Sequence, residues 1–370
     1  MKTQFQNYIV GVIKGKKRGM VPSCVKALLY IISIPYRLGM TLRNFAFDYG
    51  WIRSYSPPVP VVISIGNIVV GGTGKTPATL MIAKEFCDEF SIAILSRGYR
   101  SQAEKLAMPV VLSAGDGPLQ SAAFCGDEPY LLAQNIPKAH VIVGASRHKG
   151  ADMAAKAGAQ LILLDDGMQH RHLARDKEIV VMDISDPFGQ GRFFPFGFLR
   201  EGASSLKRAD LIILNHVKCD KRFQDVKGEL SRYSKAPIIG TKMAVIGIRD
   251  VATEREVSIH GQKVGIFSAI ANPEYFQHTV TEMGAEMIAS IAAPDHKRFK
   301  KGQLEIFAAH CKDKGAQFLV CTEKDKVKID KDLKLPLPIV WVKMRLQLVQ
   351  GNTEWSGFIA HIKDLLKSTL

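Results

Sequence analysis

A glycine-rich segment at residues 70–77, VGGTGKTP, carries side chains that can hold a nucleotide phosphate. In phosphate-binding loops, glycines let backbone N–H groups approach the phosphate, a lysine contacts its oxygens and a hydroxyl ligates Mg²⁺. The residues that match this chemistry are Gly71, Gly72, Thr73, Gly74, Lys75 and Thr76. The usual pattern, G-x-x-x-x-G-K-[ST], also requires glycine where this chain has Val69. A glycine turn with an incidental lysine is the alternative. The apolar run before the segment and the amphipathic run after it favour a strand, loop and helix that bind nucleotide.

A pair of carboxylates, Asp165 and Asp166, follows the apolar run LILL and precedes a glycine. An acidic residue that ends a buried strand beside a phosphate loop orients Mg²⁺ directly or through water. A solvated Asp-Asp-Gly turn would have the same composition. Together with the glycine loop, the pair predicts a magnesium–nucleotide site.

A second acidic segment, CGDEPY, places Asp127 and Glu128 just before a proline and an expected helix. Carboxylates at this position can simply stabilise the start of the helix. One that faces a phosphate can also accept the proton of an attacking hydroxyl. The segment APDHKRF adds Asp295 and His296. This histidine could orient Asp127 or share its proton, and an ordinary surface position is the alternative.

Three further segments contain charged residues that could contact a phosphate. Arg147 opens an expected helix, which suits a guanidinium directed at a phosphate. Residues 185–206 form a Gly- and Phe-rich loop, long enough to be functional, that contains Arg200 and Glu201. The segment CTEKDKVK at residues 321–328 is a candidate hinge or nucleotide contact, and a solvated charge run explains it equally well.

The elements that must position these residues alternate between strands and helices. Near-continuous apolar runs such as VVISI, SIAIL and ADLIIL indicate strands of a mostly parallel sheet covered on both faces. Ligands bind such sheets at the carboxyl ends of the strands. The pattern resets near residue 236. We therefore expect an α/β fold with a P-loop NTPase-type sheet at residues 57–235 and a smaller α/β lobe at residues 236–370 that closes the cleft.

Residues 1–56 differ from the rest of the chain. Up to residue 53 they hold nine Lys or Arg and one Asp, a net charge of +8 out of +15 for the whole chain. The apolar run ALLYIISI is expected to stop at Pro35, which makes it too short to span a membrane. We expect an amphipathic helix on an anionic membrane surface. A helix packed on the core is the alternative.

Composition excludes several classes of protein. Of 370 residues, 46% are hydrophobic and 23% are charged, which is typical of a globular protein rather than a disordered one. The six cysteines are scattered, with no C-x-x-C pair, so a disulfide framework or a zinc site is not expected. Reduced thiols of a cytosolic protein are the prediction.

In this order, the segments resemble the tetraacyldisaccharide 4′-kinases of lipid A biosynthesis. The resemblance covers about residues 64–328 and is carried by ISIGNIVVGGTGKTP, LSRGYR, GDEP, LLDDGMQH, LREG, AIANPEYF, PDH and TEKDKVK. Valine at position 69 belongs to the family's pattern. Met168 stands where an aromatic residue is usual, and Ala271 where glycine is common. The basic, apolar head also looks like the family's amino-terminal membrane helix.

The resemblance implies transfer of the γ-phosphate of ATP to the 4′-hydroxyl of a tetraacylated glucosamine disaccharide 1-phosphate, giving lipid IVA. It places the enzyme at the cytoplasmic face of the bacterial inner membrane as a peripheral protein, expected to be a monomer that binds no nucleic acid. It implies ATP and Mg²⁺, with Asp127 as the base, paired with His296. The residues it assigns to metal and nucleotide are Lys75, Thr76, Asp165, Asp166 and Glu201. Contacts to phosphate or acceptor would come from Glu128, Arg147, His170 and Arg200.

Three other functions fit parts of the sequence. A membrane-associated partitioning-type ATPase needs a second lysine in its loop, where this chain has Val70. A nucleotide-regulated membrane or nucleic-acid binding module would use the basic head but would leave GDEP, DDG and PDH without a role. A guanine-nucleotide switch would need N-K-x-D after a strand, and TEKD does not provide it.

Overall fold

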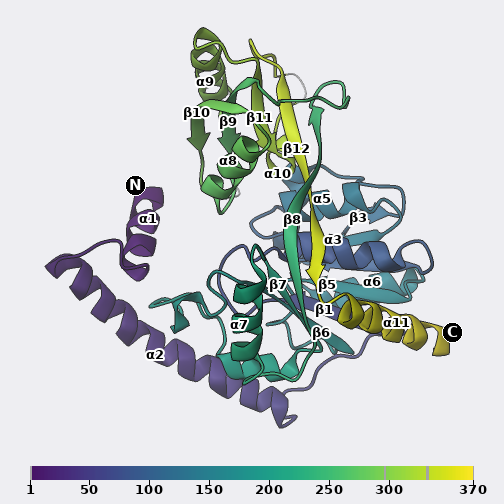
Figure 1. Ribbon diagram of the computed structural model, residues 1–370. Coiled ribbons are helices and arrows are strands. Elements are labelled where there is room, and N and C mark those ends of the chain that lie inside the picture. The colour runs from purple at the N-terminus through teal and green to yellow at the C-terminus, as the bar shows by residue number, and fades with distance from the viewer. Residues whose placement is uncertain (1, 296, 331–332, 370) are drawn as a thin grey trace.

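A computed structural model describes residues 2–295, 297–330 and 333–369 (Figure 1), so the predicted partner His296 lies outside the described residues. Over these residues the chain forms one twelve-stranded sheet in the order β10-β9-β11-β12-β8-β7-β6-β1-β5-β2-β4-β3. The strands of its first part are β1 (Val61–Gly66), β2 (Ile92–Ser96), β3 (Val110–Ala114), β4 (His140–Val143), β5 (Leu161–Asp165), β6 (Lys177–Asp183) and β7 (Leu211–Asn215). All neighbours in this part pair in parallel except β3 with β4, which confirms the expected α/β fold with a mostly parallel sheet.

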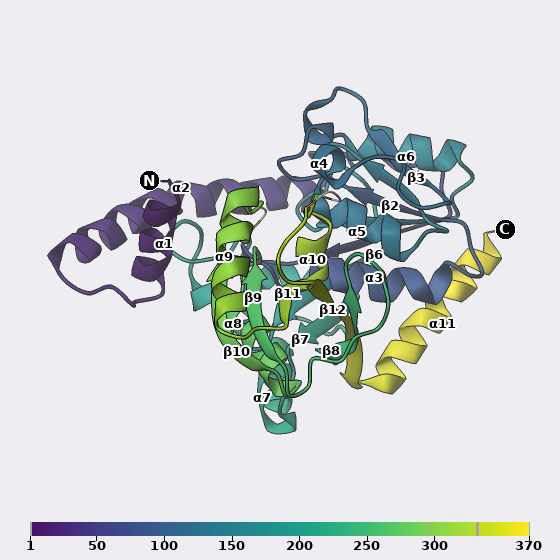
Figure 2. The ribbon, with the colours of Figure 1, turned by 90° about the horizontal axis from the view of Figure 1, so that it is seen from above.

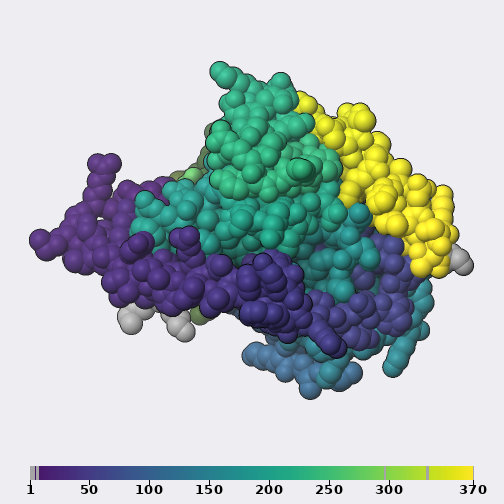
Figure 3. Space-filling model, turned by 90° about the horizontal axis from the view of Figure 1, so that it is seen from below, coloured from purple at the N-terminus to yellow at the C-terminus, as the bar shows by residue number. Residues whose placement is uncertain are grey.

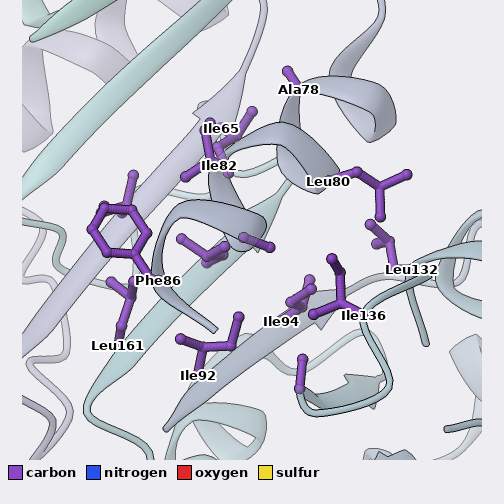
Figure 4. Packing of buried hydrophobic residues seen from close by; sticks show 14 of the residues in the cluster. Ile65, Ala78, Leu80, Ile82, Phe86, Ile92, Ile94, Leu132, Ile136 and Leu161 are labelled. Carbon is purple, nitrogen blue, oxygen red and sulfur yellow. The ribbon is translucent and has the colours of Figure 1, made fainter. Parts of the chain in front are cut away.

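Helices cover both faces of this part of the sheet. One face carries α3 (Lys75–Phe86), α5 (Asp127–Asn135) and α11 (Asn352–Ser368), and the other carries α6 (Arg147–Lys156) and α7 (Asp220–Leu230). Ile82 and Phe86 of α3 lie among Ile65, Ile92 and Leu161 of the strands (Figure 4). Because both faces are covered, the strands are apolar at nearly every position, which is why the sequence shows continuous rather than alternating runs.

The second part of the sheet contains β8 (Ile238–Asp250), β9 (Lys263–Ser268), β10 (Glu286–Ala292), β11 (Phe318–Thr322) and β12 (Ile339–Gln350). Its helices are α8 (Pro273–Glu282), α9 (Lys301–Asp313) and the short α10 (Glu323–Lys326). The long strands β8 and β12 pair antiparallel and join the two parts, since β8 also pairs with β7 and β12 with β11 (Figure 1). The helix α11, which we grouped with the smaller lobe, packs into the core of the first part through Trp355, Phe358 and Ile362. The division at residue 236 stays a prediction.

The amino-terminal head forms α1 (Lys2–Ile13) and a long helix α2 (Met20–Asp48). The expectation that the apolar run stops at Pro35 is wrong, because α2 continues through this proline. Proline removes one helical hydrogen bond. The turns of α2 after Pro35 are nevertheless kept in place by contacts with the first lobe, the part of the molecule that contains β1–β7. By length and composition α2 is apolar enough to cross a membrane. It lies on the side of the molecule opposite α11 (Figure 2) and forms a ridge along the face seen in Figure 3.

Candidate active site

The glycine loop lies between β1 and α3, as predicted. Gly71 and Gly74 have φ of 126° and 96°, values that residues other than glycine rarely adopt. The Asn215 amide donates to the carbonyl of Thr73 at 3.2 Å, and a Cβ on Gly74 would lie 2.4 Å from that amide nitrogen. The loop therefore needs glycine at position 74 and leads directly into α3 at Lys75, whose free N–H groups can hold a phosphate.

Lys75 reaches across the loop toward the end of β5. Its Nζ lies 3.6 Å from Oδ1 of Asp166 and 3.5 Å from the carbonyl oxygen of Gly71. Arg200 contacts the same carboxylate at 3.1 and 3.2 Å. Burial works to raise the pKa of Asp166, but the charges of Lys75 and Arg200 outweigh it and lower the pKa. Asp166 is thus an ionised carboxylate held beside the P-loop lysine.

Asp165, one residue earlier, has the opposite environment. It is buried and accepts hydrogen bonds from Thr79 (3.4 Å) and Ser96 (3.1 Å). Burial, together with the charges of Glu128 and Asp166, raises its pKa to about 6. A buried carboxylate that contacts only neutral donors ionises less readily than an exposed one. A divalent cation beside it would favour the ionised form.

The side chains at this edge of the sheet suit Mg²⁺. Among the described residues no three His, Cys, Asp or Glu converge on a point. Magnesium in nucleotide sites, however, takes one or two carboxylates and completes its shell with phosphate oxygens and water. Asp165, Asp166 and the Thr76 hydroxyl beside the loop supply such a partial set, so the donor chemistry fits.

Glu201 is bound by a different set of residues. Its buried carboxylate accepts hydrogen bonds from Asn44 (2.7 Å), Gln169 (3.0 Å), Ser205 (2.9 Å) and Arg208 (2.8 Å). Burial works to raise its pKa, and Arg208 with the other donors lowers it. Its assignment to the metal stays a prediction; in this structure Glu201 joins α2 to the loop that carries Arg200.

The predicted base lies at the start of α5, in contact with the second lobe. Oδ2 of Asp127 is 3.6 Å from Nζ of Lys328. Oε1 of Glu128 is 2.9 Å from Nζ of Lys324, which also lies 3.1 Å from Oδ1 of Asp295. The structure thus brings Asp127, Glu128 and Asp295 to the junction of the two lobes, where the cleft was expected.

The two predicted phosphate contacts Arg147 and His170 differ in their hydrogen-bond partners. Arg147 is buried and donates to the carbonyl oxygens of Gly144 (3.0 Å) and Asp165 (3.1 Å), which fixes the end of β4 against the end of β5. Burial lowers its pKa to about 10. Burial and neighbouring arginines lower the pKa of His170 to about 4, so it is neutral, and its Nε2 has no partner among the described residues. Contact of either with substrate stays a prediction.

The helix α2 is anchored on the active-site loops by its second half. The hydroxyl of Tyr36 donates to the carbonyl of Arg200 at 3.2 Å, and Arg43 donates to the carbonyl of Gln169 at 2.7 Å. With the bond from Asn44 to Glu201, two turns of α2 contact the segments that carry Arg200 and Gln169. The head and the site are therefore one connected structure.

Several polar residues of the site did not emerge from the sequence. Asn67 donates to the Thr73 hydroxyl at 3.1 Å, as Asn215 does to the Thr73 carbonyl. Gln169 donates to Glu201 and accepts from Arg200. The available signal was position: Asn67 follows the end of β1 and Asn215 ends β7, at the sheet edge where ligands bind.

A glycine loop between strand and helix and a lysine that faces a strand-end carboxylate are the features of a P-loop phosphotransferase. The sequence profile of the family described as tetraacyldisaccharide-1-P 4′-kinase matches residues 25–363. The chain belongs to this family and is a kinase.

Relatives and a solved structure agree with this assignment. The tetraacyldisaccharide 4′-kinase of Halothermothrix orenii is 34% identical, with 90% of each chain covered. That of Anaeromyxobacter dehalogenans is 37% identical over 92% of this chain and 89% of its own. The crystal structure of LpxK from Aquifex aeolicus in complex with ATP superimposes with a TM-score of 0.72 at 26% identity, covering 92% of this chain and 99% of that one.

Proposed function

We propose that this enzyme transfers the γ-phosphate of ATP to the 4′-hydroxyl of a tetraacylated glucosamine disaccharide 1-phosphate, giving lipid IVA, and that Asp127 takes the proton of that hydroxyl. The observation that carries the proposal is the meeting of three groups at one sheet edge. They are the P-loop after β1, the carboxylates that end the adjacent β5, and the acidic start of α5. Glu128 of α5 is close enough for its charge to contribute to the raised pKa of Asp165.

The chain's own residues can perform each part of the transfer. Backbone N–H groups at the start of α3 and the ammonium of Lys75 would hold the donor phosphates. Arg200 fixes Asp166 and Gln169 beside them. Asp127 would accept the proton as the hydroxyl attacks, and contact between the lobes would exclude water, which favours transfer over hydrolysis.

Magnesium is part of the proposal. Thr76 with Asp165 or Asp166 would hold it, and when bound it neutralises charge that develops on the phosphate oxygens. The raised pKa of Asp165 supports this role, because a bound cation would stabilise the ionised form of this buried carboxylate.

The reaction is expected to require both substrates. Full-length protein incubated with Mg·ATP labelled at the γ-phosphate and with detergent-dispersed disaccharide 1-phosphate should place the label on the lipid. The label should stay on ATP when the acceptor is left out, because the base would then have no hydroxyl to deprotonate. Acceptor-independent release of inorganic phosphate without a labelled lipid would support an ATPase instead.

We also propose that α2 docks the enzyme, as a monomer, on the cytoplasmic face of the inner membrane. A long acyl substrate remains in the bilayer, so the kinase must reach it there. Leu28, Ile31 and Leu38 of α2 are 57%, 61% and 58% exposed, and the head is strongly basic. An exposed apolar surface beside basic residues is what binds anionic lipid surfaces.

Replacing these three residues by glutamine should weaken vesicle binding with little loss of folding, because the side chains are already exposed. Flotation with vesicles that contain anionic phospholipid measures it, and a drop of about 10-fold or more is expected from the apolar area lost. The control is Ile306→Gln, 75% exposed on α9 of the second lobe, which should bind vesicles normally. Equal binding by the triple variant and wild type would leave α2 a packing role only.

A further inference from the structure

The segment at residues 322–328, TEKDKVK, lies in the second lobe and makes several polar contacts across the junction with the first. It begins where β11 ends, and Thr322 caps the short α10 by accepting a hydrogen bond from the Asp325 N–H at 3.1 Å. The cap fixes the direction of the segment. Its charged side chains are thereby presented to α5, the helix that begins with Asp127 and Glu128.

Lys324 connects one carboxylate from each lobe. Its ammonium lies 2.9 Å from Oε1 of Glu128 and 3.1 Å from Oδ1 of Asp295, and its side chain is only 17% exposed. Burial by itself would lower the pKa of Lys324, but the two carboxylates outweigh it and the pKa is raised. The lysine is therefore a fixed positive charge between two acids that belong to different lobes.

Lys328 makes the corresponding contact with the predicted base. Its Nζ is 3.6 Å from Oδ2 of Asp127, 3.5 Å from Oδ1 of Asp325 and 3.3 Å from the carbonyl oxygen of Ala269. Asp325 in turn accepts from the Ala269 N–H at 3.0 Å. Lys328 and Asp325 thus clamp the peptide of Ala269 while Lys328 holds Asp127.

The clamped peptide leads to the phosphate loop. Two residues after Ala269, the Cβ of Ala271 lies 3.5 Å from where a Cβ on Gly72 would be, which is ordinary van der Waals contact. One lysine therefore contacts both the carboxylate expected to take the proton and the segment that passes near the loop expected to hold the donor. Lys328 thus links these two parts.

The far end of α5 is held by the same segment. Glu323 accepts from Asn135, the last residue of α5, at 3.0 Å and from Arg345 of β12 at 2.7 Å. Both ends of the helix that carries the base are consequently fixed by residues 323–328 and by β12. A buried ion pair is weak evidence for stability, so this cross-lobe arrangement requires another explanation.

We propose that Lys324 and Lys328 are positioning residues for phosphoryl transfer, which hold the start of α5 so that Asp127 faces the acceptor hydroxyl only when the two lobes are in contact. The proposal rests on the role of Asp127 as the base. It means that lobe separation releases Asp127 and Glu128 together, which couples lobe contact to proton transfer. It gives the TEKDKVK segment a role as a catalytic support rather than a solvated charge run.

The test measures kcat, both KM values and the melting temperature of full-length Lys324→Met and Lys328→Met. Loss of a supporting contact typically costs about 10- to 100-fold in activity, and here we expect that loss in kcat, with KM for ATP nearly unchanged. Lys324→Arg and Lys328→Arg should recover part of it, because arginine keeps the charge. If Lys324→Met does not fold, Glu128→Gln breaks the same ion pair by changing its partner in the first lobe.

Lys326→Met is the matched control. Lys326 lies in the same segment with a side chain 14% exposed, but it pairs with Glu254 and stacks on Trp341 within the second lobe. It should change melting temperature more than kcat. Equal effects on kcat from Lys326→Met and Lys328→Met would overturn the proposal, because the loss would then reflect stability alone.

A double-mutant cycle separates this proposal from the role of Asp127. In Asp127→Asn, addition of Lys328→Met should lower kcat by less than about 3-fold, since coupled residues are not additive. Fully additive losses would reject the positioning role and leave Asp127 as the base. Near-normal turnover by Asp127→Asn, in contrast, would show that Asp127 is not the base.

Discussion

Replacing Asp127 by asparagine is expected to lower kcat by about 10²–10⁴-fold, the range that general base catalysis contributes. Asparagine keeps the size and polarity of the side chain but cannot accept a proton from the acceptor hydroxyl. The side chain is only 12% exposed and lies against Lys328, so the substitution also removes a charge pair at the lobe junction. Steady-state transfer of labelled phosphate to the lipid measures the loss.

The control for this variant is nucleotide binding. Asp127→Asn should bind Mg·ATP with nearly wild-type affinity in a calorimetric titration, because the P-loop and the carboxylates of β5 are unchanged. A variant that loses turnover and ATP affinity together would indicate a structural role for Asp127. His296 lies outside the described residues. Steady-state transfer by His296→Ala tests its predicted pairing with the base.

The parts of the fold that follow from local pattern were predictable. Continuous apolar runs separated by helical segments gave the parallel sheet, and the glycine loop lies where strand and helix patterns meet. Val69 illustrates what the pattern could not explain. It is buried, and its neighbour Val70 donates from its N–H to the Phe198 carbonyl at 2.7 Å. The positive φ values fall instead at Gly71 and Gly74, so position 69 can hold a packed side chain.

What the sequence did not reveal depends on contacts between segments far apart in the chain. Lys324 and Glu128 are 196 residues apart, and Asn44 and Glu201 are 157 apart. Such pairs are set by how the elements pack, and neither charge patterning nor periodicity contains that information. Residue type alone also did not show that the guanidinium of Arg147 donates to two carbonyl oxygens, those of Gly144 and Asp165.

Replacing Lys75 by methionine is expected to lower kcat/KM for ATP by about 10²–10³-fold, the loss typical for one preorganised charge that stabilises a transition state. The ammonium lies between the Gly71 carbonyl and Asp166, which holds it beside the glycine loop. Methionine fills a similar volume without the charge. Because Arg200 still pairs with Asp166, the carboxylate is not left without a cation and the fold should survive.

Lys84→Met, in the last turn of the same helix, is the matched control. It removes an equal charge from α3 at the end away from the loop and should leave kcat/KM for ATP within about 2-fold of wild type, as surface substitutions usually perturb little. Comparing the two variants separates the local contact of Lys75 from the general effect of charge on nucleotide attraction. If both variants lost ATP affinity to the same extent, the loop lysine would have no specific role, and the donor phosphates would be held by the backbone N–H groups and the start of α3 alone.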